Sequence, residues 1–146
     1  MAVGDKKRER SAVIIFAFIV LFIILVIMYF DKRLKDNEVA KNEVVFTDIT
    51  FQVTGYYGNI YSLDKVQSVE LKEEPPTVTE QISGIVQDDF KRGDFETEEY
   101  GKCRMYILKD EGPYIYIYMD NLLIVMDQWE SEEAYTVYNE FLEAIE

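Results

Sequence analysis

The stretch from Ala12 to Phe30 constrains this chain most, because its nineteen residues carry no charge and are almost all Val, Ile, Leu, Phe or Met. At about 1.5 Å per residue, a helix of this length reaches roughly 28 Å, close to the ~30 Å hydrocarbon core of a bilayer. Lipid offers no water to satisfy peptide groups, so such a segment must be helical. We therefore predict a basic tail over residues 1–11 and a transmembrane helix over residues 12–30.

A cleaved signal peptide is the alternative, since it also combines basic residues with an apolar run. Signal sequences have shorter apolar regions that end at small residues, whereas this run ends in MYFDK at residues 28–32. The next alanine, Ala40, follows the charged Glu38 by two positions, which makes a poor cleavage site. Tyr29 and Phe30 suit the aromatic belt of a membrane interface. The sequence favours an uncleaved, single-pass anchor in the cell membrane.

Basic residues flank this span on both sides, so the positive-inside rule hardly separates the two orientations. The tail holds four Lys and Arg, and the far flank holds Lys32, Arg33 and Lys35. Because a short, highly basic tail is difficult to translocate, we expect the N-terminus inside and the domain outside.

The net charge of −13 arises after the span, where residues 31–146 contain 11 Lys and Arg against 26 Asp and Glu. Nucleic acids and anionic lipid headgroups both select clustered Lys and Arg, so they repel such a surface. The sequence has no histidine, the usual general base and the commonest transition-metal ligand. We expect no enzyme activity, no cofactor, no metal site and no nucleic-acid binding.

The single cysteine, Cys103, permits no intrachain disulfide, so the fold must be held by burial. Cys103 alternates with Met105 and Ile107, and we expect it to be a small buried hydrophobic residue.

One domain of about 100 residues, 44–146, follows a charged connector over residues 31–43. The connector could continue the helix or act as a solvated spacer. In the domain, alternating apolar residues predict a first strand over residues 49–53. The turn GYYGN (55–59) and a further strand region follow, which Pro75 and Pro76 end because proline has no amide hydrogen.

The middle of the domain, residues 77–99, predicts short strands with turns at Ser83-Gly84 and at Arg92-Gly93-Asp94. After it, KCRMYILK (102–109) and PYIYIYM (113–119) predict two adjacent antiparallel strands. Asp120-Asn121 suits a tight hairpin turn. The following LLIVM is apolar on both faces, as expected for a strand near the centre of a sheet.

A final helix is predicted after Ser131, which can cap it. Its apolar stripe is expected to pack on the sheet, with Trp129 beneath it. The stripe consists of Tyr135, Tyr138, Leu142 and Ile145.

Several segments together resemble the bacterial pleckstrin-homology-like (PH-like) domains, small modules often fused to membrane segments. The segments are GYYGNIYSLDKVQSVEL, EEPPTVTEQISGI, RGDF, GKCRMYILKD, PYIYIYMDNLLIVMD and SEEAYTVYNEFLEAI. The resemblance covers residues 44–146 and implies a mainly β fold, a bent antiparallel barrel or sandwich of about seven strands capped by a C-terminal α-helix.

Eukaryotic PH domains bind phosphoinositides through basic residues in the loop joining their first two strands. The corresponding loop here is GYYGN (55–59) or the turn around Thr47-Asp48, and neither contains Lys or Arg. We therefore expect no phosphoinositide binding.

Five tyrosines are the candidate interaction surface. Tyr114, Tyr116 and Tyr118 share one strand face and offer flat apolar area with a polar tip, as interfaces prefer. The alternative is that the rest of a small barrel covers this face. Tyr56 and Tyr57 either form an exposed patch at their turn or fold back onto the end of the barrel.

Two other patterns have simpler explanations than a site. The acidic pairs Asp88-Asp89, Asp94 with Glu96, and Glu98-Glu99 lack EF-hand spacing and predict a solvated surface. Arg92-Gly93-Asp94 matches a cell-adhesion tripeptide, which a turn explains.

The leading hypothesis is a non-catalytic, membrane-anchored PH-like domain that acts as a protein-interaction or assembly module at the membrane surface. The alternative is a cell-envelope ligand or sensor domain that recognises a sugar, a peptide or a cation.

Overall fold

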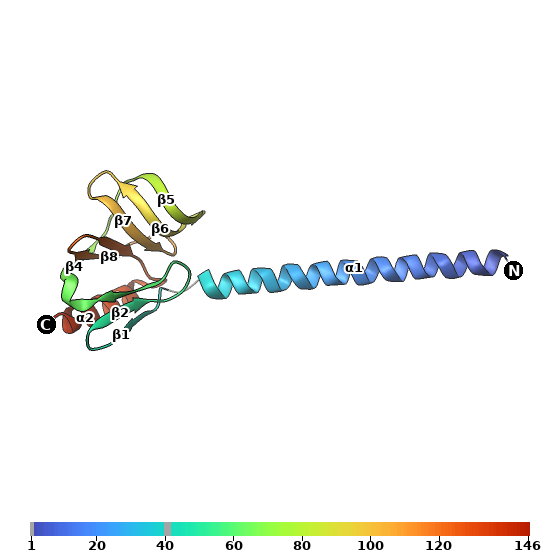
Figure 1. The fold of residues 1–146 in the computed structure, drawn as a ribbon, viewed down its shortest axis with the longest axis horizontal. Helices are drawn as coiled ribbons and strands as arrows, with labels where there is room; N and C mark the ends of the chain where they lie inside the picture. The colour runs from blue at the N-terminus through green and yellow to red at the C-terminus, as the bar shows by residue number, and fades with distance from the viewer. Residues whose placement is uncertain (1, 40–41) are drawn as a thin grey trace. The chain divides into compact units, whose positions relative to one another are not determined.

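The computed structural model describes residues 2–39 and 42–146, with side chains for residues 4–33 and 42–146. The chain divides into two compact units, Met1–Glu38 and Val39–Glu146. Figure 1 shows that the described residues of the first unit form a single helix and that the second unit is rich in strands.

Helix α1 spans Ala2–Val39, so the helix continues beyond the apolar run into the charged connector. Within it, Gly4–Arg33 is long and apolar enough to cross a membrane, and its most apolar stretch of 18 residues has a mean hydropathy of 3.4. The predicted N-terminal apolar helix is confirmed. A signal sequence would have the same features, and Ala40, the nearest alanine after the run, lies outside the described residues.

The domain begins with a small antiparallel sheet in the order β1-β2-β3. Its strands are β1 (Val44–Phe46), β2 (Thr50–Val53) and β3 (Asn59–Ser62). The predicted turn GYYGN joins β2 to β3, with positive φ angles at Gly55 and Tyr57.

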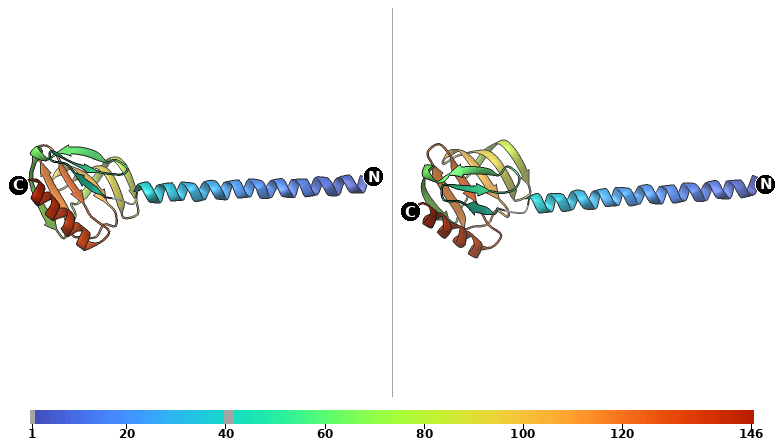
Figure 2. Two further views of the ribbon diagram at one scale, coloured as in Figure 1. Left: turned by 90° about the horizontal axis from the view of Figure 1, so that it is seen from below. Right: turned by 60° about the horizontal axis from the view of Figure 1, so that its bottom comes forward.

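A six-stranded sheet follows a short 3-10 helix, η1 (Leu63–Lys65), and has the order β4-β8-β9-β7-β6-β5. Its neighbouring strands are antiparallel except for β7 and β9, which pair in parallel. Figure 2 shows this sheet, the small sheet and the C-terminal helix from two further sides. The strands are β4 (Val66–Lys72), β5 (Val78–Gln87), β6 (Phe90–Thr97), β7 (Gly101–Ile107), β8 (Tyr114–Met119) and β9 (Leu123–Met126).

The prediction that the strands now labelled β7 and β8 are adjacent is wrong, because β9 lies between them. All four residues of β9 are buried, which confirms its predicted place near the centre of a sheet. The two observations have one cause. β9 is apolar on both faces, and its position between two paired strands covers both of them.

The middle of the domain forms one long hairpin, so the predicted short strands and their turns are wrong. Ser83-Gly84 lies within β5, and Arg92-Gly93-Asp94 lies within β6. Gly84 and Gly93 face each other with φ angles of 103° and 146°. A Cβ atom on either glycine would come within 2.2 Å of a backbone oxygen across the pair. Glycine therefore lets the two strands bend and approach closely instead of ending.

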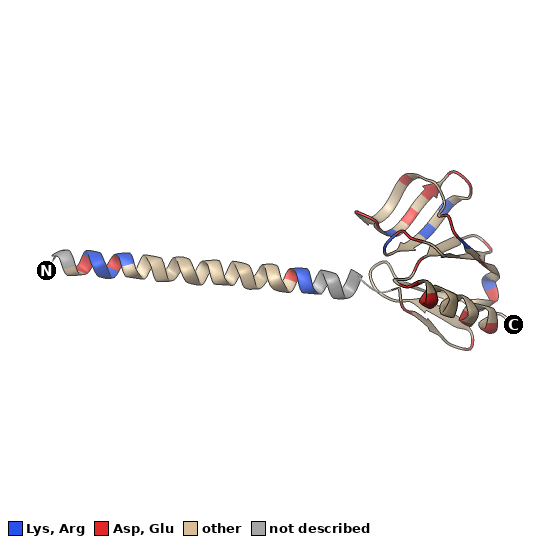
Figure 3. Ribbon diagram, turned by 180° about the vertical axis from the view of Figure 1, so that it is seen from behind, with Lys and Arg blue, Asp and Glu red and all other residues tan. Residues whose placement is uncertain are grey.

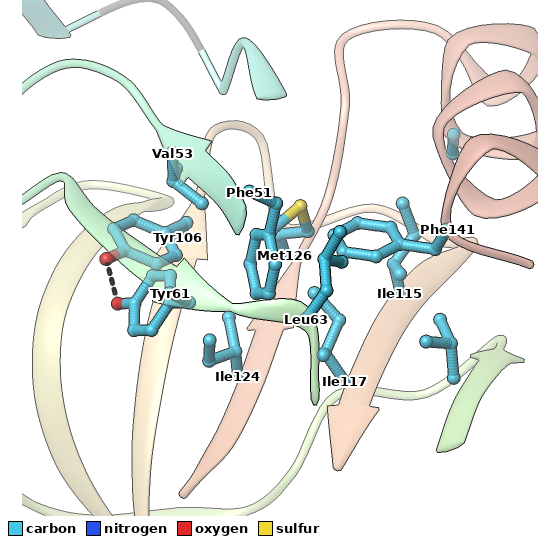
Figure 4. Packing of buried hydrophobic residues seen from close by; sticks show 12 residues of the cluster. Phe51, Val53, Tyr61, Leu63, Tyr106, Ile115, Ile117, Ile124, Met126 and Phe141 are labelled. Carbon is cyan, nitrogen blue, oxygen red and sulfur yellow. Dashed lines mark hydrogen bonds between the residues drawn. The ribbon is translucent and has the colours of Figure 1, made fainter. Parts of the chain in front are cut away.

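The main core lies between the small sheet, one face of the large sheet and helix α2 (Ser131–Ala144). Figure 4 shows Phe51 and Phe141 in this core, with ring centroids 4.9 Å apart and the rings nearly perpendicular. Its fully or nearly fully buried residues are Phe51, Val53, Tyr61, Leu63, Val69, Tyr106, Ile115, Ile117, Ile124, Met126, Ala134 and Phe141.

A second cluster lies on the opposite face of the large sheet, because successive strand residues point to opposite sides. It consists of Phe95, Cys103, Met105, Ile107, Tyr114, Tyr116, Leu123 and Val125. Cys103 is fully buried there, as predicted. The protein is thus mainly β, with an N-terminal apolar helix and a C-terminal helix, and its described residues form nine strands in two sheets where about seven were expected.

Helix α2 is predicted correctly in position but is rotated relative to the expected stripe. Tyr138 and Ile145 of that stripe pack against the core as expected, but Tyr135 and Leu142 are 50% and 36% exposed, and Ala134 and Phe141 are buried instead. Phe141 is the largest apolar side chain of the helix and packs between two aromatic rings of the small sheet, which fixes this rotation. The helix begins at Ser131, and its N-cap is Glu130 without a side-chain hydrogen bond.

Candidate functional site

The predicted tyrosine row on β8 points into the second cluster. Tyr114 and Tyr116 are each 2% exposed, and Tyr118 is half-buried. The Tyr114 hydroxyl donates to Oδ1 of Asp110 at 3.0 Å, and the Tyr116 hydroxyl donates to the Glu74 carbonyl at 2.7 Å. Two of the three phenols are therefore covered and hydrogen-bonded within the domain, as the alternative interpretation of this row expected.

Tyr116 and Tyr118 join Tyr100 in a cluster around the ammonium of Lys72, the last residue of β4. The Lys72 Nζ lies 4.9 to 5.8 Å from the three ring centroids and donates to the Tyr100 hydroxyl at 2.9 Å. Glu70 lies 3.5 Å from the same ammonium. Hydrogen bonding to Tyr100 and Tyr118 raises the pKa of Lys72 above its usual value. This aromatic site thus holds a cation of its own chain.

Sequence reasoning missed Lys72 and Tyr100 because they become neighbours of the row only through strand pairing. β4 pairs with β8, which sets Lys72 opposite Tyr114. Tyr100 comes from the turn between β6 and β7. No spacing along the chain signals this arrangement.

Tyr56 and Tyr57 point in different directions from their turn. Tyr56 is 44% exposed. Tyr57 folds back, donates to Ser83 Oγ at 2.6 Å and lies 5.6 Å beneath the guanidinium of Arg104. The pair therefore contains one outward ring and one ring that folds back onto Ser83 and Arg104.

A chain of polar side chains runs from Arg104 into the main core. Arg104 donates to both carboxylate oxygens of Asp94 at 2.9 and 3.0 Å, and to the Tyr61 hydroxyl at 3.3 Å. The Tyr61 and Tyr106 hydroxyls are 2.6 Å apart, and Tyr106 donates to the Tyr57 carbonyl. The Arg104 guanidinium lowers the pKa of Asp94, and burial raises the pKa of Tyr106. These groups satisfy one another, so the network fixes the fold.

The adhesion-like tripeptide is inaccessible, because Arg92 is 0% exposed and Asp94 is 7% exposed within β6. Arg92 donates to the Thr54 carbonyl at 2.6 Å. Among the described residues, no group of three or more Asp, Glu, Cys or His side chains is arranged to hold a metal ion.

A groove of about 750 Å³ lies between the start of β1 and the outer face of α2. Figure 3 shows acidic and no basic bands on α2. The residues that line the groove include five glutamates and no Lys or Arg among the part of the chain that the structure describes. They are Asn42, Glu43, Val44, Gln128, Trp129, Glu130, Glu132, Glu133, Thr136, Val137 and Glu140.

Trp129 lines this groove and is 47% exposed, so the expectation that it packs beneath the helix is wrong. The place beneath the helix is taken by Phe46 and Phe51, which contact Phe141. The spacing of the glutamates on one helix face could have indicated the groove from the sequence.

Asn42 fixes one wall of the groove. Its Nδ2 donates to the Tyr106 and Asp127 carbonyls at 2.6 and 2.9 Å, and Gln128 Nε2 donates to the backbone carbonyl of Asn42 at 3.0 Å. Asn42 is 2% exposed, and its Oδ1 has no hydrogen-bond partner among the described residues. The two donated bonds hold the amide in one orientation, so Oδ1 is a fixed, buried acceptor.

Comparisons with protein-family models, curated proteins and solved structures found no match to this chain. The groove and the tyrosine cluster are therefore the basis for the functional argument.

Proposed function

We propose that this chain is a non-catalytic, single-pass membrane protein whose β domain acts as a protein-interaction or assembly module at the membrane surface. The groove between β1 and α2 carries the proposal, since it presents the chain's only tryptophan, half-exposed, beside a row of carboxylates. Exposed tryptophan is rare on ordinary surfaces and enriched at the centres of protein interfaces. The apolar helix α1 supports the membrane anchor.

The class of domain and its orientation are parts of the same proposal. Strands followed by a closing C-terminal helix support a PH-like architecture, while the parallel pair of β7 and β9 departs from an all-antiparallel barrel. The short basic tail supports an N-terminus inside and a domain outside. Protease treatment of intact cells tests the orientation: we expect the domain to be cleaved, and its resistance until the cells are opened would reverse the assignment.

Site-specific photo-crosslinking of the full-length chain in cells tests the function. A photoreactive amino acid in place of Thr136, an exposed residue of the groove, is expected to capture one dominant protein. The matched control replaces Ile82, which is 49% exposed on β5. The proposal predicts no such product at the control position, and equal products at both positions, or none at either, would contradict it.

The alternative function, a sensor domain for a small ligand, is favoured by one observation, the acidic lining of the groove. A soluble cation bound there would raise the melting temperature of the full-length protein in detergent by mass action. A panel of sugars and calcium chloride distinguishes the functions, since an interaction module gains stability from neither.

A further inference from the structure

We infer that the groove between β1 and α2 binds an extended, lysine- or arginine-rich segment of a partner protein. This inference rests on the proposed function and specifies the chemistry of the partner.

The distribution of charge in the groove is the first argument. Glu132, Glu133 and Glu140 lie on one face of α2, spread over about 12 Å at ~1.5 Å of rise per residue. This spread is too wide for carboxylates that share one metal ion. It matches an extended chain, in which alternate side chains on one face recur about every 6.6 Å. The groove therefore suits a row of cations better than a single ion.

The apolar part of the groove is the second argument. Val44 and Val137 line it together with Trp129. Lysine and arginine have long aliphatic stems that pack on apolar surface while their charged ends reach carboxylates. The face of a tryptophan ring also attracts such cations more strongly than other aromatic rings do. One basic side chain can thus use both kinds of surface in this groove.

The buried amide of Asn42 is the third argument. Its Oδ1 lacks a partner among the described residues at a position that lines the groove. Oδ1 is covered in the free structure, so a ligand donor reaches it only when the groove wall opens, and the new bond then removes the cost of an unpaired buried acceptor. Backbone N–H groups, ammonium and guanidinium are all donors that a basic segment brings.

The negative charge of the domain also argues against a second copy of the domain, an anionic lipid surface or a nucleic acid as the ligand of the groove. Residues 31–146 carry 15 more acidic than basic side chains, so a second copy of the domain meets repulsion across the acidic face. Anionic headgroups and nucleic acids meet the same repulsion. A basic segment is attracted by this field as well as by the groove itself.

Trp129 provides the measurement, because it is the only tryptophan and lines the groove. We expect the emission of full-length protein in phosphatidylcholine nanodiscs to shift saturably as a synthetic peptide of alternating lysine and valine is added. The same peptide with acetylated lysines keeps its length and loses its charge, so we expect no shift with it. An equal shift with the acetylated peptide, or with submillimolar calcium chloride, would overturn the inference.

Charge-matched variants separate the groove from the general field of the domain. Glu133→Gln with Glu140→Gln removes two carboxylates of the groove and is expected to weaken binding about fivefold or more. Glu80→Gln with Glu98→Gln removes two exposed carboxylates elsewhere and is expected to change binding less than about twofold. Equal weakening in both variants would overturn the inference.

The two proposals fail differently. A dominant protein crosslinked at position 136, combined with no binding of the lysine peptide, refutes the basic segment and leaves the interaction module. Peptide binding without any protein crosslink at position 136 refutes the interaction module instead.

Discussion

The hydroxyl oxygens of Tyr61 and Tyr106 lie 2.6 Å apart and connect β3 of the small sheet to β7 of the large sheet (Figure 4). Tyr106 donates its proton to the Tyr57 carbonyl at 3.0 Å, so Tyr61 is the donor between the two hydroxyls. Tyr61 in turn accepts from Arg104. The direction of donation is therefore fixed along the whole chain of hydrogen bonds.

This direction predicts unequal effects of removing the two hydroxyls. Tyr106→Phe leaves the Tyr61 hydroxyl proton without an acceptor and the Tyr57 carbonyl without this donor, and we expect it to lower the free energy of unfolding by about 2–4 kcal/mol. Tyr61→Phe keeps the bond from Tyr106 to the Tyr57 carbonyl and loses only the longer 3.3 Å bond from Arg104 besides the bond between the two hydroxyls, and we expect a loss of about 1–2 kcal/mol. Urea denaturation followed by circular dichroism measures both. A larger loss for Tyr61→Phe would contradict the assigned direction.

The bidentate pair of Asp94 and Arg104 predicts a loss of stability in acid. Arg104 lowers the pKa of the Asp94 carboxyl below its usual value. A carboxyl with a lowered folded-state pKa stabilises the fold above the unfolded pKa of about 3.9 and loses that contribution as the pH falls through the folded value. We expect Asp94→Asn to be less stable at pH 7 and to lose less further stability on acidification.

Denaturation of the wild type, Asp94→Asn and Glu98→Gln at neutral pH and near pH 3 measures this difference. Glu98 is exposed, so Glu98→Gln serves as the control for removing one carboxylate. The same decrease in stability with acid for Asp94→Asn as for the wild type would show that the pair does not contribute.

Local sequence patterns predicted the strands and turns that are marked by alternating or continuous apolar residues and by turn-forming residues. The strand with buried Phe51 and Val53, the fully apolar β9 and the turn before β3 all follow from periodicity and turn residues. The order of the strands in the sheet could not be predicted in the same way. The place of β9 between β7 and β8 depends on which strand most needs two covered faces, which is a property of the whole sheet.

Sites assembled by pairing could not be found from single segments. Lys72 and Tyr100 meet the tyrosine row only after β4 pairs with β8. The glycines at 84 and 93 were interpreted as turns because glycine marks turns and close strand contacts equally well. Trp129 was misplaced for a similar reason, since the rotation of α2 depends on how Phe141 fits the small sheet.

The contact of Gly84 with Gly93 predicts that neither tolerates a side chain. Gly93→Ala would set a Cβ 2.2 Å from the Ser83 carbonyl oxygen at a φ of 146°, so the hairpin must distort. We expect a loss of about 3 kcal/mol or more in the free energy of unfolding. Gly101→Ala is the control, because its φ is also positive but its Cβ meets nothing closer than 3.7 Å. Equal losses in the two variants, measured by urea denaturation, would show that close approach is unimportant.

The hydrogen bonds of Asp127 lead us to expect that the conformation of the β7–β8 loop depends strongly on this one carboxylate. Its two oxygens accept the backbone N–H groups of Leu108, Lys109 and Asp110 at 2.6, 3.2 and 2.8 Å. Asp127→Asn replaces one acceptor with a donor that faces N–H groups, and we expect a loss of about 2–4 kcal/mol. Asp48→Asn changes an exposed carboxylate and serves as the control. Hydrogen exchange at the three amides measures the effect locally, and unchanged protection would contradict it.

The environment of Cys103 predicts a thiol that reacts only when the protein unfolds. The side chain is 0% exposed, and burial, with the charge of Asp94 as a smaller contribution, raises the thiol pKa to about 12. The thiolate is the reactive species, so at pH 8 native protein is expected to react with iodoacetamide at least about 100-fold more slowly than protein in urea. Mass spectrometry of the alkylated chain gives both rates. A variant with Ser68→Cys and Cys103→Ala carries one exposed thiol and is expected to react rapidly in both conditions. A native rate for Cys103 within about tenfold of the rate in urea would mean that the second cluster opens far more often than a packed core does.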